Sequence, residues 1–237
     1  MVRRLHDQGL TASIDLFGEQ VRDETAARAA ADDYVALAGA LADLPGGTDL
    51  SHVGLDIAVD FCRDQVARII TALPPQARLQ IGAEDGAHTD RILEVILGLA
   101  RDGSPIVATL QANLRRSERD AAALAAAGVP VRLVKGAYVE PAEVSYAWGE
   151  ETDVAFIRLA YDLRVGGAEV VIATHDPVLR EALLAAFPEL GIEMLLGVRS
   201  EDAVMLARRG KPARIYVPYG HDWFRYWMRR LAESRGA

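Results

Sequence analysis

The chain is poor in cysteine and in long apolar runs. Its 237 residues include one cysteine, Cys62, so no intrachain disulfide can form. Cys62 lies in an apolar segment, and because a free cysteine packs as a small hydrophobe, we expect it to be buried. No apolar run reaches the roughly 18 residues that span a membrane, and the amino terminus has no secretory-signal run. These absences predict a cytoplasmic protein whose contact with a membrane is at most peripheral.

An excess of positive charge is also missing. The sequence has 26 lysines and arginines against 34 aspartates and glutamates, which gives a net charge of −8. Proteins that bind nucleic acids neutralise phosphates with basic patches, so this balance argues against a nucleic-acid partner. Hydrophobic residues make up 51% of the chain, enough to bury a continuous core. The composition is therefore that of a globular protein.

What the sequence does have is a regular alternation of two kinds of segment. Short apolar, β-branched runs alternate with longer runs that have the period of amphipathic helices. The predicted strands are Leu10–Phe17, Asp49–Leu55, Arg78–Ala83, Ile106–Gln111, Val131–Val134, Val170–Thr174, Glu193–Leu196 and Arg214–Val217. The predicted helices are Glu24–Leu41, Phe61–Ala72, Thr89–Ala100, Glu118–Ala126, Asp153–Arg164, Pro177–Phe187, Ser200–Arg208 and Asp222–Glu233. Parallel strands need crossover helices, so this order predicts an α/β fold.

Two α/β architectures compete, a closed barrel and an open doubly wound sheet. The open sheet that binds dinucleotides carries Gly-x-Gly-x-x-Gly straight after its first strand. That place holds Phe17-Gly18-Glu19-Gln20, which lacks the fingerprint. Eight repeats without a domain-splitting linker favour a (βα)8 TIM-like barrel. We expect a single domain over residues 1–237, with the C-terminal helix closing the active site.

Polar residues follow several predicted strands at their C-terminal ends, where such barrels place their active sites. They are Gln111, Asn113, His175, Asp176, Tyr219 and His221. Each one alone is equally consistent with a solvated loop residue. Their agreement across strands favours a site at this end.

The fifth predicted strand ends with two cations. Side chains alternate along a strand, so Arg132 and Lys135, three positions apart, point to opposite faces. Only one of them can then face the barrel interior. An arginine there needs a ligand or a neighbouring carboxylate, because burying it unpaired costs on the order of several kcal/mol. Gly136 would let a planar ligand approach the backbone closely.

The last predicted helix has a polar face. Tyr226, Arg229, Arg230 and Glu233 fall at i, i+3, i+4 and i+7 and so share one side. Two adjacent arginines suit a carboxylate, which a guanidinium binds bidentately. The alternative is that basic residues near a helix C-terminus only favour the helix dipole.

In combination, these motifs resemble the proline dehydrogenase family. The resemblance rests on Leu133–Tyr138, Ala173–Asp176, Tyr216–Gly220 and the pattern Tyr226-x-x-Arg229-Arg230-x-x-Glu233. It extends from Asp15 on the first strand to the C-terminus, nearly the whole chain. It implies a flavin-binding β/α barrel that oxidises L-proline to pyrroline-5-carboxylate and passes the electrons to a quinone-type acceptor.

The resemblance also implies roles for single residues. FAD would be held by Gln111, Arg132, Val134, Gly136, Ala137, Tyr138, Thr174, His175 and Glu233. Arg229 and Arg230 would hold the substrate carboxylate, and Tyr216 and Tyr226 would pack near the substrate ring. No metal is expected. Hydride leaves the ring carbon next to nitrogen for flavin N5, so the protein contributes mainly positioning and a clamp on the carboxylate.

The chain departs from the family on two strands. It has Asp49 where the family has lysine, and Gly82 where the family has aspartate. We expect Asp49 to share a strand face with Ser51 and to repel a simple α-carboxylate. Such a residue would favour a substrate with a cationic or hydrogen-bond-donating group, and L-proline would then be a poor substrate. The alternative is that the second strand bends so that Asp49 meets solvent or pairs with a loop arginine.

Three alternatives stay open beside oxidation of a free cyclic amino acid. The first is a relative that acts on a modified or carrier-tethered cyclic amino acid. The second is a degenerate barrel that binds a ligand without turnover. The third is a flavin-free lyase that uses Lys135 as a Schiff-base amine. The lyase is disfavoured, because Lys135 should face away from Arg132.

Overall fold

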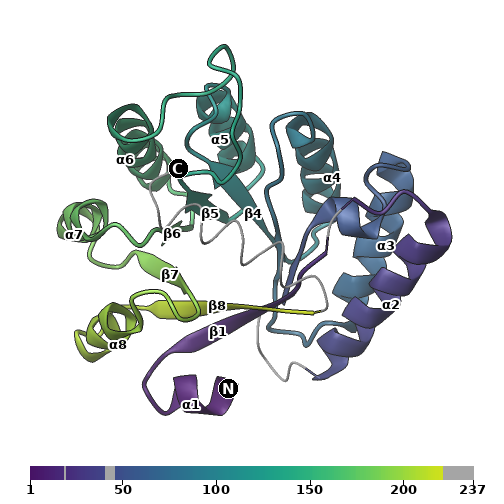
Figure 1. The fold of residues 1–237 in the computed structure, drawn as a ribbon, viewed down its shortest axis with the longest axis horizontal. Coiled ribbons are helices and arrows are strands. Elements are labelled where there is room, and N and C mark those ends of the chain that lie inside the picture. The colour runs from purple at the N-terminus through teal and green to yellow at the C-terminus, as the bar shows by residue number, and fades with distance from the viewer. Residues whose placement is uncertain (19, 41–45, 221–237) are drawn as a thin grey trace. The chain divides into compact units, whose positions relative to one another are not determined.

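The computed structural model describes residues 1–18, 20–40 and 46–220. Eight strands follow one another in chain order around a closed barrel, and a helix follows each of the first seven (Figure 1). The predicted TIM-like barrel is therefore confirmed, and the open sheet is excluded. The predicted helix Asp222–Glu233, with its expected closure of the active site, lies outside the described residues.

The bounds of the elements are as follows. The strands are β1 (Thr11–Leu16), β2 (Gly46–Thr48), β3 (Leu79–Ile81), β4 (Ile106–Gln111), β5 (Val131–Val134), β6 (Val170–Ala173), β7 (Gly191–Leu195) and β8 (Ala213–Tyr219). The helices are α1 (Val2–His6), α2 (Glu24–Ala40), the 3-10 helix η1 (Leu50–Val53), α3 (Val59–Ala72), α4 (Thr89–Arg101), α5 (Ser117–Ala126), α6 (Glu150–Val165), α7 (Pro177–Ala186) and α8 (Ser200–Arg208).

The chain forms two compact units. The first comprises Met1–Ser13, Ile106–Gly136 and Glu140–Val217. The second comprises Ile14–Pro105, Ala137–Val139 and the chain from Pro218. The single domain over residues 1–237 stays a prediction.

In the first unit, the core lies between the strands and the helices. Val131, Leu133 and Ile172 of the strands are buried, as are Phe156 and Leu159 of α6, which contacts both β5 and β6. Side chains alternate along a strand, so the intervening positions of β5 point to the face turned away from the helices. On β5 this second face carries Arg132 and Val134, which are only partly buried.

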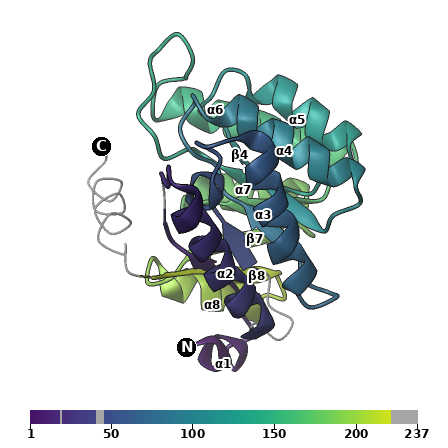
Figure 2. The same cartoon turned by 90° about the vertical axis from the view of Figure 1, so that its right-hand side faces the viewer.

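In the second unit, α2 and α3 pack side by side (Figure 2). Ala27 and Ala31 on α2 and Val66 on α3 are fully buried, and the small alanines let the two helices approach closely. Cys62 on α3 is buried, as predicted. Burial, and then the charge of Glu84, raises the pKa of the Cys62 thiol to about 12, so this thiol stays protonated.

The prediction for the second strand was wrong. The strand is Gly46–Thr48, whereas the apolar segment Asp49–Leu55 forms η1 and the turn after it. Helix η1 ends at Gly54, whose φ of 99° lies in the left-handed region that favours glycine. The apolar pattern correctly indicated burial here, but the burial is achieved by a helical turn.

Strand β2 has no large apolar residues, because the neighbouring strand β1 leaves little room for side chains at Gly47. A Cβ added at Gly47 would lie 3.3 Å from Cγ of Asp15 on the paired strand β1. Because this strand has small residues at the contact, it lacks the apolar alternation by which strands are predicted from sequence.

The other predicted elements within the described residues are confirmed. Strands β4 and β5 and helix α8 match to the residue, and the bounds of the rest differ by at most three residues. Helix α1 was not predicted. Within the part of the chain that the structure describes, no helix is both long and apolar enough to cross a membrane.

Candidate active site

Arg132 of β5 forms an ion pair with Glu193 of β7. Its Nε donates to Glu193 Oε1. The side chain of Glu193 is 0% exposed and that of Arg132 is 13% exposed, so both charges are largely removed from water. The Arg132 guanidinium also lies 5.4 Å from the centroid of the Tyr216 ring, a cation–π contact. The structure thus brings two predicted site residues together and supplies the neighbouring carboxylate that the sequence left as an alternative.

Glu193 has two further partners. The Ser13 hydroxyl donates to its Oε2 over 3.3 Å, and Arg214 Nη1 lies 3.7 Å from the same oxygen. Sequence reasoning did not single out Glu193. A signal was available, because a glutamate between the buried Ile192 and Met194 is a polar residue within a strand and needs partners.

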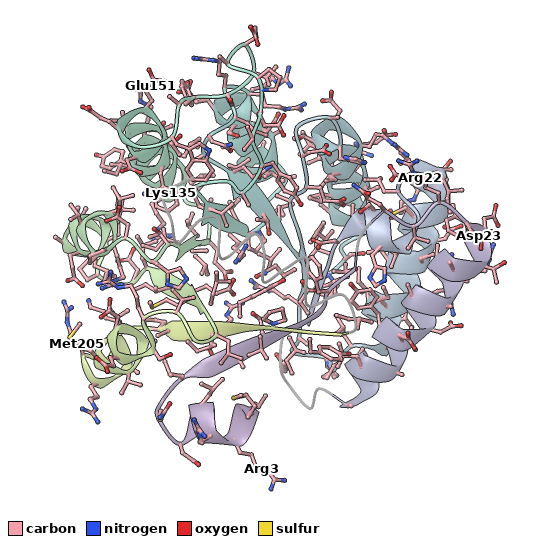
Figure 3. All side chains as sticks on the ribbon, in the orientation of Figure 1. Arg3, Arg22, Asp23, Lys135, Glu151 and Met205 are labelled. Atoms are coloured by element: carbon pink, nitrogen blue, oxygen red, sulfur yellow. The ribbon has the colours of Figure 1, made fainter. Side chains whose placement is uncertain are left out.

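Lys135 lies directly after β5 (Figure 3). Its partners lie at the starts of helices and not on the strands, which agrees with the predicted direction away from Arg132. Its Nζ lies 2.5 Å from Asp153 on α6 and 3.2 Å from Asp176 at the start of α7. Burial acts to raise the pKa of Asp176, but the hydrogen bonds from Lys135 and from the Leu179 and Val178 backbone hold that pKa below its ordinary value. An amine held in two ion pairs does not suit Schiff-base chemistry, which agrees with the prediction against a lyase.

The end of β4 brings Gln111 and Asn113 to Gly136. Both polar side chains are buried, and Gly136 has a φ of 121°, which favours glycine. A Cβ at Gly136 would lie 2.1 Å from Asn113 Oδ1, so no larger residue fits. Asn113 Oδ1 has no hydrogen-bond partner among the described residues. A buried acceptor of this kind suits a donor on a ligand.

The end of β6 carries Thr174 and His175. Thr174 Oγ1 accepts a hydrogen bond from Asp176 N over 3.1 Å, and His175 Nε2 accepts one from Leu195 N over 3.2 Å. A backbone amide can only donate, so Nε2 is unprotonated and the ring carries its proton on Nδ1. Val134 lies close by, because its partner across the ladder is Ala173, the last residue of β6.

The remaining predicted site residues do not belong to the described part of the first unit. Ala137 and Tyr138 follow Gly136 in the chain but belong to the second unit. The residues outside the described part of the chain are Tyr226, Arg229, Arg230 and Glu233, together with the strand-end residue His221.

The second unit contains Asp49 and Gly82, where the chain departs from the family pattern. Asp49 lies between β2 and η1 and does not share a strand face with Ser51, because β2 ends at Thr48. Its carboxylate fills the space beside Gly82, where an added Cβ would lie 1.8 Å from Asp49 Oδ1. The two departures are therefore complementary, since the missing side chain at 82 makes room for the carboxylate at 49.

A buried tyrosine lies near these carboxylates. Tyr34 Oη donates to the Leu16 carbonyl over 2.5 Å and lies 3.2 Å from His52 Nδ1. Burial, and then the charges of Asp15 and Asp49, raises the pKa of Tyr34 well above its ordinary value of 10.0. The phenol therefore stays protonated and acts as a donor.

Comparison with known proteins points to one family. The family model described as proline dehydrogenase matches residues 1–237. Proline dehydrogenase 2 of Bacillus subtilis (strain 168) is 30% identical, over 98% of this chain and 80% of that protein. Proline dehydrogenase of Deinococcus radiodurans is 30% identical, over 98% of this chain and 81% of that protein. The crystal structure of proline utilization A from Bdellovibrio bacteriovorus has the same fold, with a TM-score of 0.88 at 19% identity over 97% of this chain and 30% of that longer chain.

Proposed function

Because the chain belongs to the proline dehydrogenase family, we propose that it oxidises L-proline to the pyrroline with FAD as its cofactor. In this proposal the electrons pass on to a quinone-type acceptor. The structural observation that carries the proposal is Arg132, a guanidinium held by the buried Glu193 on the strand face turned away from the helices. A fixed cation of this kind suits an electron-rich ring system.

Four residues of the first unit fit FAD. Arg132 and Gln111 offer donors on neighbouring strands, and Asn113 offers a buried acceptor that no described residue satisfies. Gly136 has no side chain and so makes room for this Asn113 amide, since an added Cβ would lie 2.1 Å from Asn113 Oδ1. When bound, FAD supplies the hydride-accepting nitrogen N5 and carries the electrons to the second substrate.

The protein's own task in this reaction is orientation. Lys135 is held in two ion pairs, and His175 Nε2 accepts a backbone hydrogen bond, so neither is arranged as a proton acceptor. Tyr216 is fixed by its contact with Arg132 and would pack on the substrate ring. Arg229 and Arg230 would complete the site as the clamp on the substrate carboxylate, which is a proposal from the family pattern.

A second candidate substrate is a cyclic amino acid with an additional hydrogen-bond donor, such as a hydroxylated proline. Asp49 favours it, because the family has a lysine at this position and a carboxylate attracts donors and repels another carboxylate. A steady-state assay with a dye acceptor and both substrates separates the two candidates. A higher kcat/KM for L-proline supports the first proposal, and a higher value for hydroxyproline supports the second.

A quinone acceptor would bring the protein to a membrane, where quinones dissolve. We therefore propose a cytoplasmic protein with peripheral membrane contact during turnover. Activity with a lipid-soluble quinone should then rise when vesicles are added, whereas activity with a water-soluble dye should not change.

The identity of the cofactor has its own test. Protein is loaded with FAD, freed of unbound flavin and heated to release what it holds. The released compound should co-elute with FAD on chromatography. Folded protein that retains no flavin would overturn the cofactor assignment.

A further inference from the structure

We propose that Glu193 is a positioning residue that fixes the guanidinium of Arg132 for contact with the cofactor. This inference rests on the proposed function for the identity of the cofactor. It adds a residue to which neither the motifs nor the family resemblance assigned a role. Glu193 acts through Arg132 and is not itself a catalytic residue.

The first observation is the burial of the Glu193 carboxylate. Its side chain is 0% exposed on β7, and its chain neighbours Ile192 and Met194 are buried as well. An ionised group in such surroundings destabilises the fold unless donors satisfy it. The Glu193 carboxylate is satisfied by Arg132 Nε, by the Ser13 hydroxyl over 3.3 Å and by Arg214 Nη1 at 3.7 Å. All of these donors belong to the first unit.

The second observation is that two different contacts restrain one guanidinium. Glu193 engages Arg132 at Nε, in the plane of the group. The Tyr216 ring, with its centroid 5.4 Å from the guanidinium carbon, gives the group a second, cation–π contact. An unrestrained arginine loses side-chain entropy when a ligand orders it, and ligand binding would otherwise have to offset this loss. The two contacts therefore pre-organise Arg132.

The third observation is the charge of the network. Arg132 and Arg214 carry two positive charges and Glu193 carries one negative charge, which leaves 2 − 1 = +1 among these three residues. Among these three residues, Glu193 therefore balances one of the two positive charges and leaves one. A positive charge is what an electron-accepting ring system requires from its surroundings.

A purely structural role is the competing explanation. Glu193 would then only compensate the two arginines, and its loss would lower stability without changing the bound cofactor. The two explanations differ in the properties of the flavin itself, which report on the surroundings of Arg132.

The experiment compares Glu193→Gln with wild type in FAD-loaded protein. The glutamine keeps the shape and removes the charge. We expect FAD to dissociate about 10- to 100-fold more readily, the size typical of partners that orient a binding group. The visible absorbance band of the bound flavin should also shift, and flavin reduction at saturating L-proline should slow while KM changes little.

Two further variants make the test specific. Glu181→Gln removes a carboxylate from an exposed pair with Arg209 in the same unit, and it should leave FAD affinity and the flavin band unchanged. Arg132→Lys removes the group on which Glu193 is proposed to act. Adding Glu193→Gln to Arg132→Lys should then cost much less FAD affinity than it does in wild type.

Each outcome decides the inference. Wild-type FAD affinity and an unshifted band in folded Glu193→Gln would overturn it, as would full additivity with Arg132→Lys. If Glu193→Gln does not fold, Glu193→Asp decides, because it keeps the charge but withdraws it by one methylene. A shifted band and weaker FAD binding in that variant support the inference, and wild-type values overturn it. These readouts need no proline, so a failure of wild type to oxidise L-proline overturns the proposed function and leaves this test intact.

Discussion

At the scale of single residues, the two cations of the β5 segment, Arg132 and Lys135, differ in where their counter-charges lie. Arg132 meets the buried Glu193 on the strand face turned away from the helices. Lys135 meets Asp153 and Asp176 at the starts of two helices. The first cation pairs with a residue of another strand, whereas the second ties the end of β5 to the starts of two helices.

The sequence predicted part of this arrangement. The period of two along a strand is a local property, so the opposite directions of Arg132 and Lys135 could be inferred and are confirmed. The pairing of Arg132 with Glu193 could not be inferred, because it joins β5 to β7 across β6. Contacts between residues 61 positions apart depend on barrel closure and register, which no local pattern encodes.

The first prediction concerns the proposed carboxylate clamp. Replacing Arg229 or Arg230 with lysine keeps the charge but removes the planar bidentate contact. We expect kcat/KM for L-proline to fall by the equivalent of about 1–3 kcal/mol, with little change in the free energy of unfolding. Steady-state kinetics and urea unfolding measure the two effects. Unchanged kinetics in both variants would leave only the helix-dipole interpretation.

The second prediction concerns Gly82. Gly82→Asp should lower the free energy of unfolding by about 1–3 kcal/mol, because its Cβ would lie 1.8 Å from Asp49 Oδ1. The control is Gly39→Asp on α2, where an added Cβ meets nothing within 4 Å. Urea unfolding provides the comparison. Equal losses in both variants would contradict the steric account.

Asp49→Lys together with Gly82→Asp should be tolerated better than Gly82→Asp alone. The double variant removes the carboxylate that fills this space and restores the charges of the family pattern. If Asp49 limits the use of L-proline, the double variant should also gain kcat/KM for L-proline. Efficient proline oxidation by the unmodified protein, with no gain in the double variant, would show that Asp49 has no effect on the use of L-proline.

At the scale of elements, the strands that carry apolar alternation were predicted well and the one that lacks it was missed. Strands β4 and β5 match to the residue because apolar residues at alternate positions fill their buried faces. Strand β2, with the sequence Gly-Gly-Thr, is set by its close contact with Asp15 on β1. A consequence was the wrong placement of Asp49, which was predicted to lie within a strand and instead precedes η1.

The third prediction tests the structural role of Lys135. Lys135→Gln removes both ion pairs between the end of β5 and helices α6 and α7. We expect the free energy of unfolding to fall by about 1 kcal/mol, since the pairs are partly exposed, with FAD binding and turnover unchanged. A folded variant that loses turnover completely would revive the lyase hypothesis.

The fourth prediction concerns a histidine that joins α4 to the segment before α3. His88 precedes α4; its Nδ1 lies 2.6 Å from Asp85 and its Nε2 lies 2.9 Å from Asp56. Burial lowers the pKa of His88, but the hydrogen bonds to Asp85 and Asp56 and the charges of Asp85 and Glu84 outweigh it and raise the pKa above 6.5.

A raised pKa means that the folded state favours the protonated imidazole. The stability that His88 contributes should therefore be complete below its ordinary pKa of about 6.5 and be lost as pH rises through the raised value. Unfolding free energies of wild type and His88→Asn, measured across this range, should converge at high pH. A difference that stays constant or grows with pH would contradict the account.

At the scale of the whole molecule, the order of elements was the strongest information in the sequence. Eight strands alternating with helices, and no dinucleotide fingerprint after the first, were enough to predict a closed barrel, which the strand order confirms. The family match over residues 1–237 agrees with the resemblance carried by the motifs. What the pattern could not provide is the set of contacts between distant strands, such as those that surround Glu193.

The central claim, oxidation of L-proline with FAD, is tested most directly by anaerobic mixing. FAD-loaded protein is combined with excess L-proline in the absence of oxygen and of any other acceptor, and the visible flavin absorbance is followed. The account predicts that the band bleaches with L-proline and returns when a quinone or dye acceptor is added. A flavin-loaded, folded protein whose band is unchanged by L-proline would contradict it.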